Sequence, residues 1–99
     1  MASQAKIPDG ELDSALRSLP GWTIAGGKLH REYKFADFVA AFGFMATAAL
    51  RIEAMGHHPE WSNVYNRVTV DLVTHDAHGI TAKDLELAAK LEEIARKLQ

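Results

Sequence analysis

Three histidines stand where regular secondary structure is expected to end. His57 and His58 follow an apolar helical segment, and His75 closes a segment in which apolar and polar residues alternate. Imidazole has an ordinary pKa of about 6.5, so it can give or accept a proton near neutral pH. Side chains at the ends of rigid elements can also converge on a ligand. We therefore expect His57, His58 and His75 to form an acid/base site for a small ligand.

The adjacent pair His57-His58 is expected to supply two different groups. Pro59 biases His58 towards extended backbone, and neighbouring side chains of an extended chain point in different directions. One imidazole would then touch the ligand while the other braces it. Glu53 precedes His57 by about one helical turn, so its carboxylate is expected to orient that imidazole, with a solvated carboxylate as the simpler alternative.

A metal site is the main alternative for a histidine cluster, because neutral imidazole is a common zinc ligand. The chain has no HExxH segment and no cysteine. Adjacent histidines in extended chain point apart, so they are poorly placed to share one ion. We expect neither a metal ion nor another cofactor. The lack of cysteine also excludes disulfides and cysteine nucleophiles, and it fits a cytoplasmic location.

Other polar and aromatic residues have simpler interpretations. His30 and His78 are expected to be surface or hydrogen-bonded residues, and Asp84 is expected to cap a helix rather than act in catalysis. Trp61 and Tyr65 would either form a flat apolar wall for a planar heterocycle or pack in the core. The sequence favours neither interpretation of these two aromatic residues.

The N-terminal third is predicted to hold a helix followed by a β-hairpin. A helical stripe of apolar residues over 9–19 ends at Pro20-Gly21. Two short strand-like runs, 22–25 and 28–34, flank Gly26-Gly27. Glycine tolerates positive φ, so this pair suits a tight two-residue turn.

The rest of the chain is predicted to form a core helix, one long strand and a final helix. Apolar residues recur at alternating steps of three and four over 35–54 and occupy several sides, so this helix should be covered on more than one face. Even positions of 64–75 are mostly apolar and odd ones polar, which predicts a strand, with a bulge or turn at 65–67 as the alternative. Thr81 and Asp84 resemble a capping box. Helices would pack on one face of an antiparallel sheet, an α+β fold.

The size and charge of the chain narrow its class. Ninety-nine residues suffice for a single domain over 1–99, with residues 1–7 expected to be frayed. A formal net charge of -2 and a pI near 6.2 argue against a nucleic-acid partner. The most apolar stretch, 35–50, is shorter than the roughly 20 residues that span a bilayer, and no secretory signal is recognised, so a water-soluble protein is expected. The small size and the apolar core helix favour a homo-oligomer.

The spacing of several separated residues resembles the motif of the pterin-4a-carbinolamine dehydratases. The residues that carry this motif are Glu53, His57, His58, Pro59, Tyr65, His75 and Asp84. The stretch HHPEWSNVYN and the run Phe42-Gly43-Phe44-Met45 are also similar to that family. The resemblance covers the chain from Trp22 onward.

The resemblance implies an enzyme that dehydrates 4a-hydroxytetrahydropterin to the quinonoid dihydropterin, without a metal or a redox cofactor. It also implies dimers or tetramers and a functional link to an aromatic amino acid hydroxylase. His57 and His75 would be the acid/base pair, in an order that the sequence does not fix, while His58 aids binding and Glu53 orients an imidazole. The pterin-binding residues would be Gly56, His57, His58, Pro59, Trp61, Val73, Thr74, His75 and Asp76.

Two other functions remain open at this point. Some animal members of the family also act as a dimerisation cofactor, and so as a coactivator, for a homeodomain transcription factor. A pterin-related role in molybdopterin metabolism would keep the same fold and the same histidines.

Overall fold

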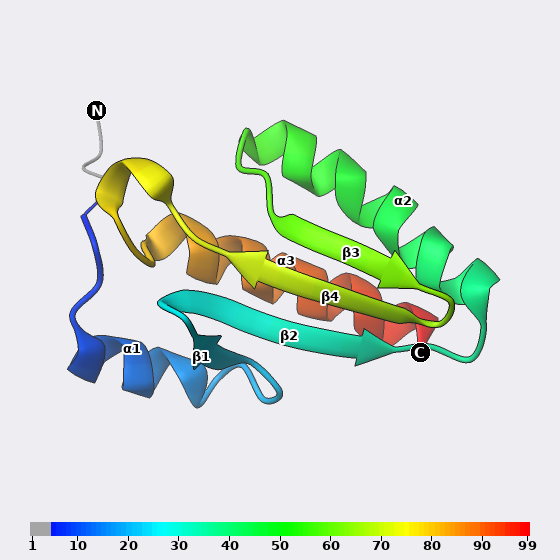
Figure 1. The fold of residues 1–99 in the computed structure, drawn as a ribbon, viewed down its shortest axis with the longest axis horizontal. Coiled ribbons are helices and arrows are strands. Elements are labelled where there is room, and N and C mark those ends of the chain that lie inside the picture. The colour runs from blue at the N-terminus through cyan, green and yellow to red at the C-terminus, as the bar shows by residue number, and fades with distance from the viewer. Residues whose placement is uncertain (1–4) are drawn as a thin grey trace.

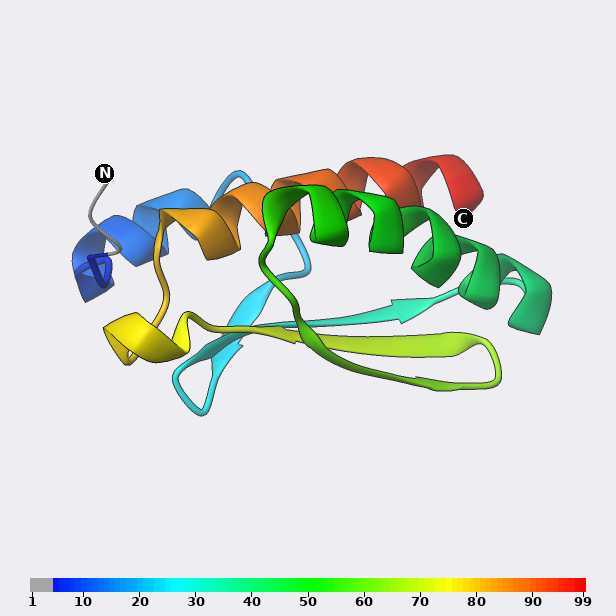
Figure 2. The ribbon, with the colours of Figure 1, turned by 90° about the horizontal axis from the view of Figure 1, so that it is seen from above.

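The computed structural model describes residues 5–99, which form a four-stranded antiparallel sheet with three α-helices over one face (Figures 1 and 2). The strand order is β1-β2-β4-β3, so β4 lies inside the sheet. The expected α+β class is confirmed. The elements in chain order are α1 (Asp9–Leu16), β1 (Thr23–Ala25), β2 (Lys28–Lys34), α2 (Phe38–Met55), β3 (Glu60–Val64), β4 (Arg67–Leu72), the 3-10 helix η1 (His75–Ala77) and α3 (Ala82–Leu98).

The first hairpin forms as predicted. Gly26 and Gly27 have φ values of 60° and 77°, the left-handed conformation that a two-residue hairpin turn requires. Ala25 and Lys28 pair directly across this turn. Helix α1 ends at Leu16, three residues before the end of the predicted helix over 9–19.

A second hairpin replaces the single long strand that was predicted over 64–75. β3 and β4 pair antiparallel, and the chain reverses at residues 65–66. This turn contains no glycine, although Tyr65 has a φ of 51°. The amide of Asn63 supports the turn by donating to the carbonyls of Tyr65 and Arg67, at 3.1 and 2.9 Å. Polar Asn66 occupies an even position of the pattern, and the turn at 65–67, given as the alternative to an unbroken strand, is the one that forms.

Helix α2 presents one face to the core and another to solvent. Asp37 caps its first turn by accepting a hydrogen bond from the N–H of Ala40 at 2.8 Å. The inner face is buried and consists of Ala41, Phe44, Ala48 and Ile52. The outer face of α2 carries four exposed apolar residues, Phe38, Val39, Phe42 and Leu50. Cover on more than one side of this helix was therefore a wrong expectation for a single chain.

Helix α2 is also apolar enough, by length and composition, to cross a membrane. Its 18 residues have a mean hydropathy of 1.5. The core helix of a water-soluble protein passes the same test but is mostly buried, whereas only 22% of α2, its inner face, is buried in this chain. The property of α2 that needs an explanation is the exposed outer face.

The last helix and the N-terminal segment close the domain. Helix α3 starts at the predicted capping box of Thr81 and Asp84. Of the stretch expected to fray, 1–7, residues 1–4 lie outside the described residues. Ile7 is held, because its backbone N–H donates to the carbonyl of Ile80 at 2.8 Å and its side chain packs against the core.

Candidate active site

The end of helix α2 positions His57 and His58. Gly56 adopts a φ of 64°, a left-handed conformation that ends the helix, and its N–H donates to the carbonyls of Glu53 and Ile52. The chain then turns sharply towards β3, which begins at Glu60. The two imidazoles therefore leave the helix at a stiff corner, as the sequence predicted.

The segment after β4 positions His75. β4 ends at Leu72, so His75 does not close the strand as expected but opens the 3-10 turn η1. Thr74 anchors this turn: its backbone N–H donates to Gly79, and its carbonyl accepts from Ala77, at 3.0 and 3.1 Å.

The two segments meet at an open cavity of about 230 Å³. Six of the expected site residues line it, namely His57, His58, Val73, Thr74, His75 and Asp76. Gly56 and Pro59 lie beside it in the chain and do not line it. The three imidazoles predicted to share one pocket therefore do so.

The expected aromatic wall is not part of this cavity. Trp61 lies on β3 opposite Val70 and packs, half-buried, against the core. Tyr65 is exposed at the β3–β4 turn, and Figure 1 shows that this turn lies at the opposite end of the hairpin from the segments that enter β3 and leave β4, where the cavity lies. Of the two interpretations open for these residues, the structure supports core packing for Trp61 and neither for Tyr65.

His57 is held by Asp84 rather than by Glu53. Its Nε2 lies 2.5 Å from Oδ1 of Asp84, a carboxylate that is fully buried. The other oxygen of Asp84 accepts from the hydroxyl of Thr74 and the N–H of Thr81, both at 2.9 Å. An ionised carboxylate only accepts, so His57 donates its Nε2–H and the neutral ring has its lone pair on Nδ1. Asp84 is thus both the predicted cap and a partner of the site.

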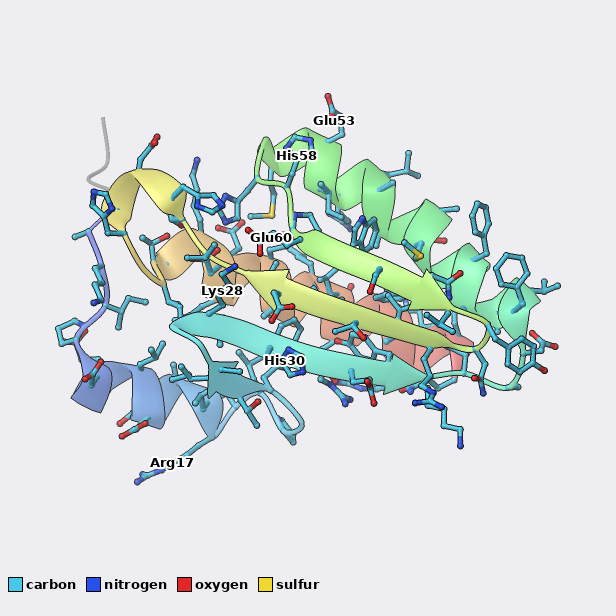
Figure 3. All side chains as sticks on the ribbon, viewed as in Figure 1. Arg17, Lys28, His30, Glu53, His58 and Glu60 are labelled. Carbon is cyan, nitrogen blue, oxygen red and sulfur yellow. The ribbon has the colours of Figure 1, made fainter. Side chains whose placement is uncertain are left out.

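Glu53, whose carboxylate was expected to contact His57, contacts His58 instead. The Nε2 of His58 lies 3.0 Å from Oε1 of Glu53, and Figure 3 shows the two side chains together at the end of α2. Gly56 reverses the backbone, so the helical spacing from Glu53 no longer reaches His57. The side chains of His58 and Glu53 are 64% and 82% exposed, and such surface pairs contribute at most about 1 kcal/mol.

His75 meets a carboxylate that the sequence analysis did not single out. Its Nε2 lies 3.2 Å from Oε2 of Glu60, while Oε1 of Glu60 contacts Nζ of Lys28 at 2.6 Å (Figure 3). The hydrogen bond from Lys28 holds the pKa of Glu60 below its ordinary value of 4.5, and the same bond raises the pKa of Lys28. An anion therefore stays beside His75 at neutral pH. The only signal in the sequence was the position of Glu60 in the stretch HHPEWSNVYN.

The two remaining histidines lie apart from the cavity. His30 pairs with Asp71 on the open face of the sheet at 2.8 Å, and His78 ends the turn η1 with a φ of 58°. Both fit the surface or hydrogen-bonded roles expected for them. Among residues 5–99, no three His, Cys, Asp or Glu side chains gather in a geometry that could hold a metal ion.

A small α+β domain that gathers three imidazoles, each beside a carboxylate, has the fold and the groups of an acid/base enzyme. The sequence profile of the family described as pterin 4 alpha carbinolamine dehydratase matches residues 5–94. The chain belongs to this family, whose members are hydro-lyases.

Individual relatives agree over most of the chain. A protein of Solibacter usitatus (strain Ellin6076) named as a pterin-4-alpha-carbinolamine dehydratase is 67% identical over 90 residues, 91% of this chain and 95% of its own length. A protein of the same name from Prochlorococcus marinus (strain MIT 9303) is 55% identical over 79% of this chain and 81% of its own. The crystal structure of a transcriptional coactivator/pterin dehydratase from Brucella melitensis superimposes with a TM-score of 0.87 at 48% identity, covering 91% of this chain and 98% of that one.

Proposed function

We propose that the chain dehydrates a 4a-hydroxytetrahydropterin to the quinonoid dihydropterin, with His57 and His75 as the acid/base pair. One observation carries the proposal: both rings line the same cavity and both are engaged through Nε2. Within residues 5–99, Nδ1 of neither ring has a hydrogen-bond partner. Each ring therefore has a nitrogen available to a ligand while its other nitrogen is held.

The reaction requires two proton transfers and no change of oxidation state. The bond between C4a and the hydroxyl oxygen breaks, and the N5 lone pair forms the C4a–N5 double bond as the N5 proton is lost. A protonated imidazole donates to the departing hydroxyl, which leaves as water, while a neutral imidazole accepts the N5 proton. His57 and His75 supply these two groups, and neither a metal ion nor a redox cofactor is needed.

The other residues of the cavity would bind the pterin. His58, braced by Glu53, contributes a polar contact at the helix exit. Residues 73–76 form the opposite wall, and their backbone groups suit the amide-like edge of a pterin ring. The side chain of Thr74 donates to Asp84, and its backbone N–H and carbonyl bond Gly79 and Ala77, so Thr74 would support this wall rather than bind the ligand through a free polar group.

The reaction fits recycling of the pterin that an aromatic amino acid hydroxylase leaves as its 4a-hydroxy product, in the cytoplasm. The test adds purified protein to a phenylalanine hydroxylase reaction and follows decay of the 4a-hydroxypterin absorbance by stopped flow. Acceleration that is lost in His57→Ala and His75→Ala supports the proposal. Unchanged decay with the wild-type chain contradicts it, and a role in molybdopterin metabolism then becomes the better explanation of the site.

The outer face of α2 supports a second proposal, that the chain assembles with copies of itself. Four exposed apolar side chains on one helix face gain about 25 cal/mol for each Å² that a partner covers. A second copy of the chain presents the same apolar face and fits a symmetric contact. The Brucella melitensis protein is named a transcriptional coactivator as well as a pterin dehydratase, so a dimerisation partner is the alternative occupant of this face.

A further inference from the structure

Apart from the aromatic residues Trp22 and Tyr33, which donate to Glu92, the buried polar side chains of residues 5–99 belong to one cluster. Thr74, Thr81 and Asp84 are 8%, 1% and 0% exposed, and no other non-aromatic polar or charged residue in this part of the chain is buried to this degree. Burying a polar group is unfavourable unless it is hydrogen-bonded, and here every buried polar side-chain atom has a partner. The cluster lies directly behind His57.

The hydrogen bonds of the cluster have a fixed direction. The carboxylate of Asp84 accepts on Oδ2 from the N–H of Thr81 and the hydroxyl of Thr74. The single hydroxyl proton of Thr74 is thereby used, so in the 2.7 Å contact between the threonines the hydroxyl of Thr81 donates to that of Thr74. The hydroxyls donate in sequence from Thr81 to Thr74 and from Thr74 to Oδ2 of Asp84, which leaves Oδ1 of Asp84 to accept from His57.

Helix capping alone does not explain this arrangement. The capping box needs only two contacts within 81–84: Asp84 accepts from the backbone N–H of Thr81, and the hydroxyl oxygen of Thr81 accepts from the backbone N–H of Asp84. Thr74 comes from the segment that leaves β4, and its hydroxyl adds a further donor to a carboxylate that the cap had already satisfied. The backbone of the same residue starts the turn that carries His75.

We propose that Thr74 and Thr81 are positioning residues that fix Asp84, and that Thr74 thereby sets the tautomer of His57 and its placement relative to His75. The assignment rests on the proposed acid/base role of the two imidazoles. Thr74 is the common support: its hydroxyl acts on His57 through Asp84, and its backbone carries His75. The chain of hydroxyls ends at buried Thr81, so it orients groups and does not conduct protons to solvent.

The test compares Thr74→Val, which keeps the shape and removes the hydroxyl, with Thr74→Ser, which keeps the hydroxyl. Thr69→Val on the open face of β4 is the matched control for the substitution. Two quantities are measured on the full-length protein: kcat for dehydration, and the imidazole ¹⁵N shifts of His57, which report its tautomer without substrate. Thermal melting checks that each variant is folded.

We expect Thr74→Val to lower kcat by about ten- to a hundredfold, by analogy with the loss of a hydrogen-bond partner that orients a metal-bound histidine. The ¹⁵N shifts should move from a ring protonated at Nε2 to a mixture of tautomers. Thr74→Ser and Thr69→Val should keep wild-type values. Thr81→Val removes both the donor to Thr74 and the side-chain acceptor of the helix cap, so it should have a smaller effect of the same sign on the ¹⁵N shifts and should also lower the melting temperature.

A folded Thr74→Val variant with a wild-type His57 spectrum overturns the inference, whatever its activity. If Thr74→Val does not fold, the ¹⁵N spectrum of His57 in Thr81→Val decides whether the threonines set its tautomer. A wild-type chain without dehydratase activity overturns the proposed function instead, and the spectra of the variants still decide the role of the threonines.

Discussion

The imidazole of His57 donates to the carboxylate of Asp84, a residue 27 positions further along the chain. Asp84 is fully buried at the start of α3, and His57 leaves the end of α2. The packing of these two helices on the sheet therefore creates the pair. A rigid carboxylate of this kind keeps one ring nitrogen protonated and leaves the other for the ligand.

Asp84→Asn should keep the fold and lose most of the activity. An amide oxygen can still accept from Thr81 and Thr74, so the amide NH₂ would face His57 and require the opposite tautomer of its ring. A wrong tautomer in a comparable pair lowers kcat by up to about 10⁴-fold. Stopped-flow dehydration assays and melting curves check this prediction. A variant with more than a tenth of the wild-type kcat would show that Asp84 does not orient His57.

Glu53→Gln, unlike Asp84→Asn, should keep most of the dehydratase activity. Glu53 touches exposed His58 and not His57, so its loss should change kcat by less than about threefold and the free energy of unfolding by less than about 1 kcal/mol. The same assays apply, with Asp84→Asn as the sensitive reference. A drop in kcat that matches Asp84→Asn would restore Glu53 to the orienting role suggested by its spacing.

The residues changed in these two variants also show which contacts of His57 the sequence could and could not predict. The spacing from Glu53 to His57 is a helical one, and it predicted the wrong partner because the left-handed Gly56 ends the helix between them. The contact of His57 with Asp84 depends on how distant elements pack, which local periodicity does not encode. Only the family motif, in which both residues take part, linked them before the structure was known.

The same limit applies to the fold. Gly26-Gly27 identified the first hairpin, because two consecutive left-handed residues favour glycine. The second hairpin turns at Tyr65, where the amide of Asn63 stabilises an unusual conformation through two backbone carbonyls. Signals based on residue type therefore identified the first turn directly, whereas the second was only the less favoured alternative to an unbroken strand over 64–75. The capping box at Thr81 was detected because it is local.

Lys28→Met should raise the pKa of Glu60 towards its ordinary value, since the hydrogen bond from Lys28 is the largest cause of the lowering. Glu60 stabilises the fold above its unfolded-state pKa, and this contribution is lost as the pH falls through the lower pKa of the folded state. A ¹³C NMR titration of the carboxyl group measures the change. An unchanged pKa of Glu60 in Lys28→Met would show that the two side chains are not paired in solution.

Glu60→Gln should lower the dehydration rate while Lys28→Met hardly changes it at neutral pH. Glu60 stays ionised at pH 7 with or without Lys28, so only its own replacement removes the anion beside His75. The comparison of kcat in the two variants separates the charge of Glu60 from the ion pair at the surface. Equal kcat values for Glu60→Gln and the wild type would exclude Glu60 from the site.

Glu92→Gln should lower the free energy of unfolding, although Glu92 lies outside the candidate active site. One oxygen of Glu92 accepts from Trp22, Arg31 and Tyr33, at 3.0, 3.0 and 2.7 Å, and so ties α3 to the first hairpin. Burial opposes ionisation of Glu92, but the hydrogen bonds from Tyr33 and Arg31 outweigh it and lower its pKa, while burial and Glu92 raise the pKa of Tyr33. An amide oxygen is a weaker acceptor for these donors, which should cost about 1–3 kcal/mol at pH 7.

The pH dependence of this loss has a definite sign. A lowered pKa means that Glu92 stabilises the fold above its unfolded-state pKa, near 4.5, and ceases to do so as the pH falls through the folded-state value. The difference in melting temperature between Glu92→Gln and the wild type should therefore shrink in acid. A difference that grows below pH 4 would contradict the assignment.

Phe42→Glu should dissociate the assembly without unfolding the chain. Phe42 is 57% exposed and stacks on Phe38, 5.7 Å away between ring centres, so a carboxylate there meets water in a single chain and a second apolar helix in an oligomer. Light scattering after size exclusion measures the mass. Thr23→Glu is the control, because Thr23 lies on the edge strand β1 and not on α2. This variant adds the same charge elsewhere and should keep the wild-type mass. A wild-type protein that is already monomeric at micromolar concentration would exclude self-association, and the outer face of α2 would then belong to a different partner.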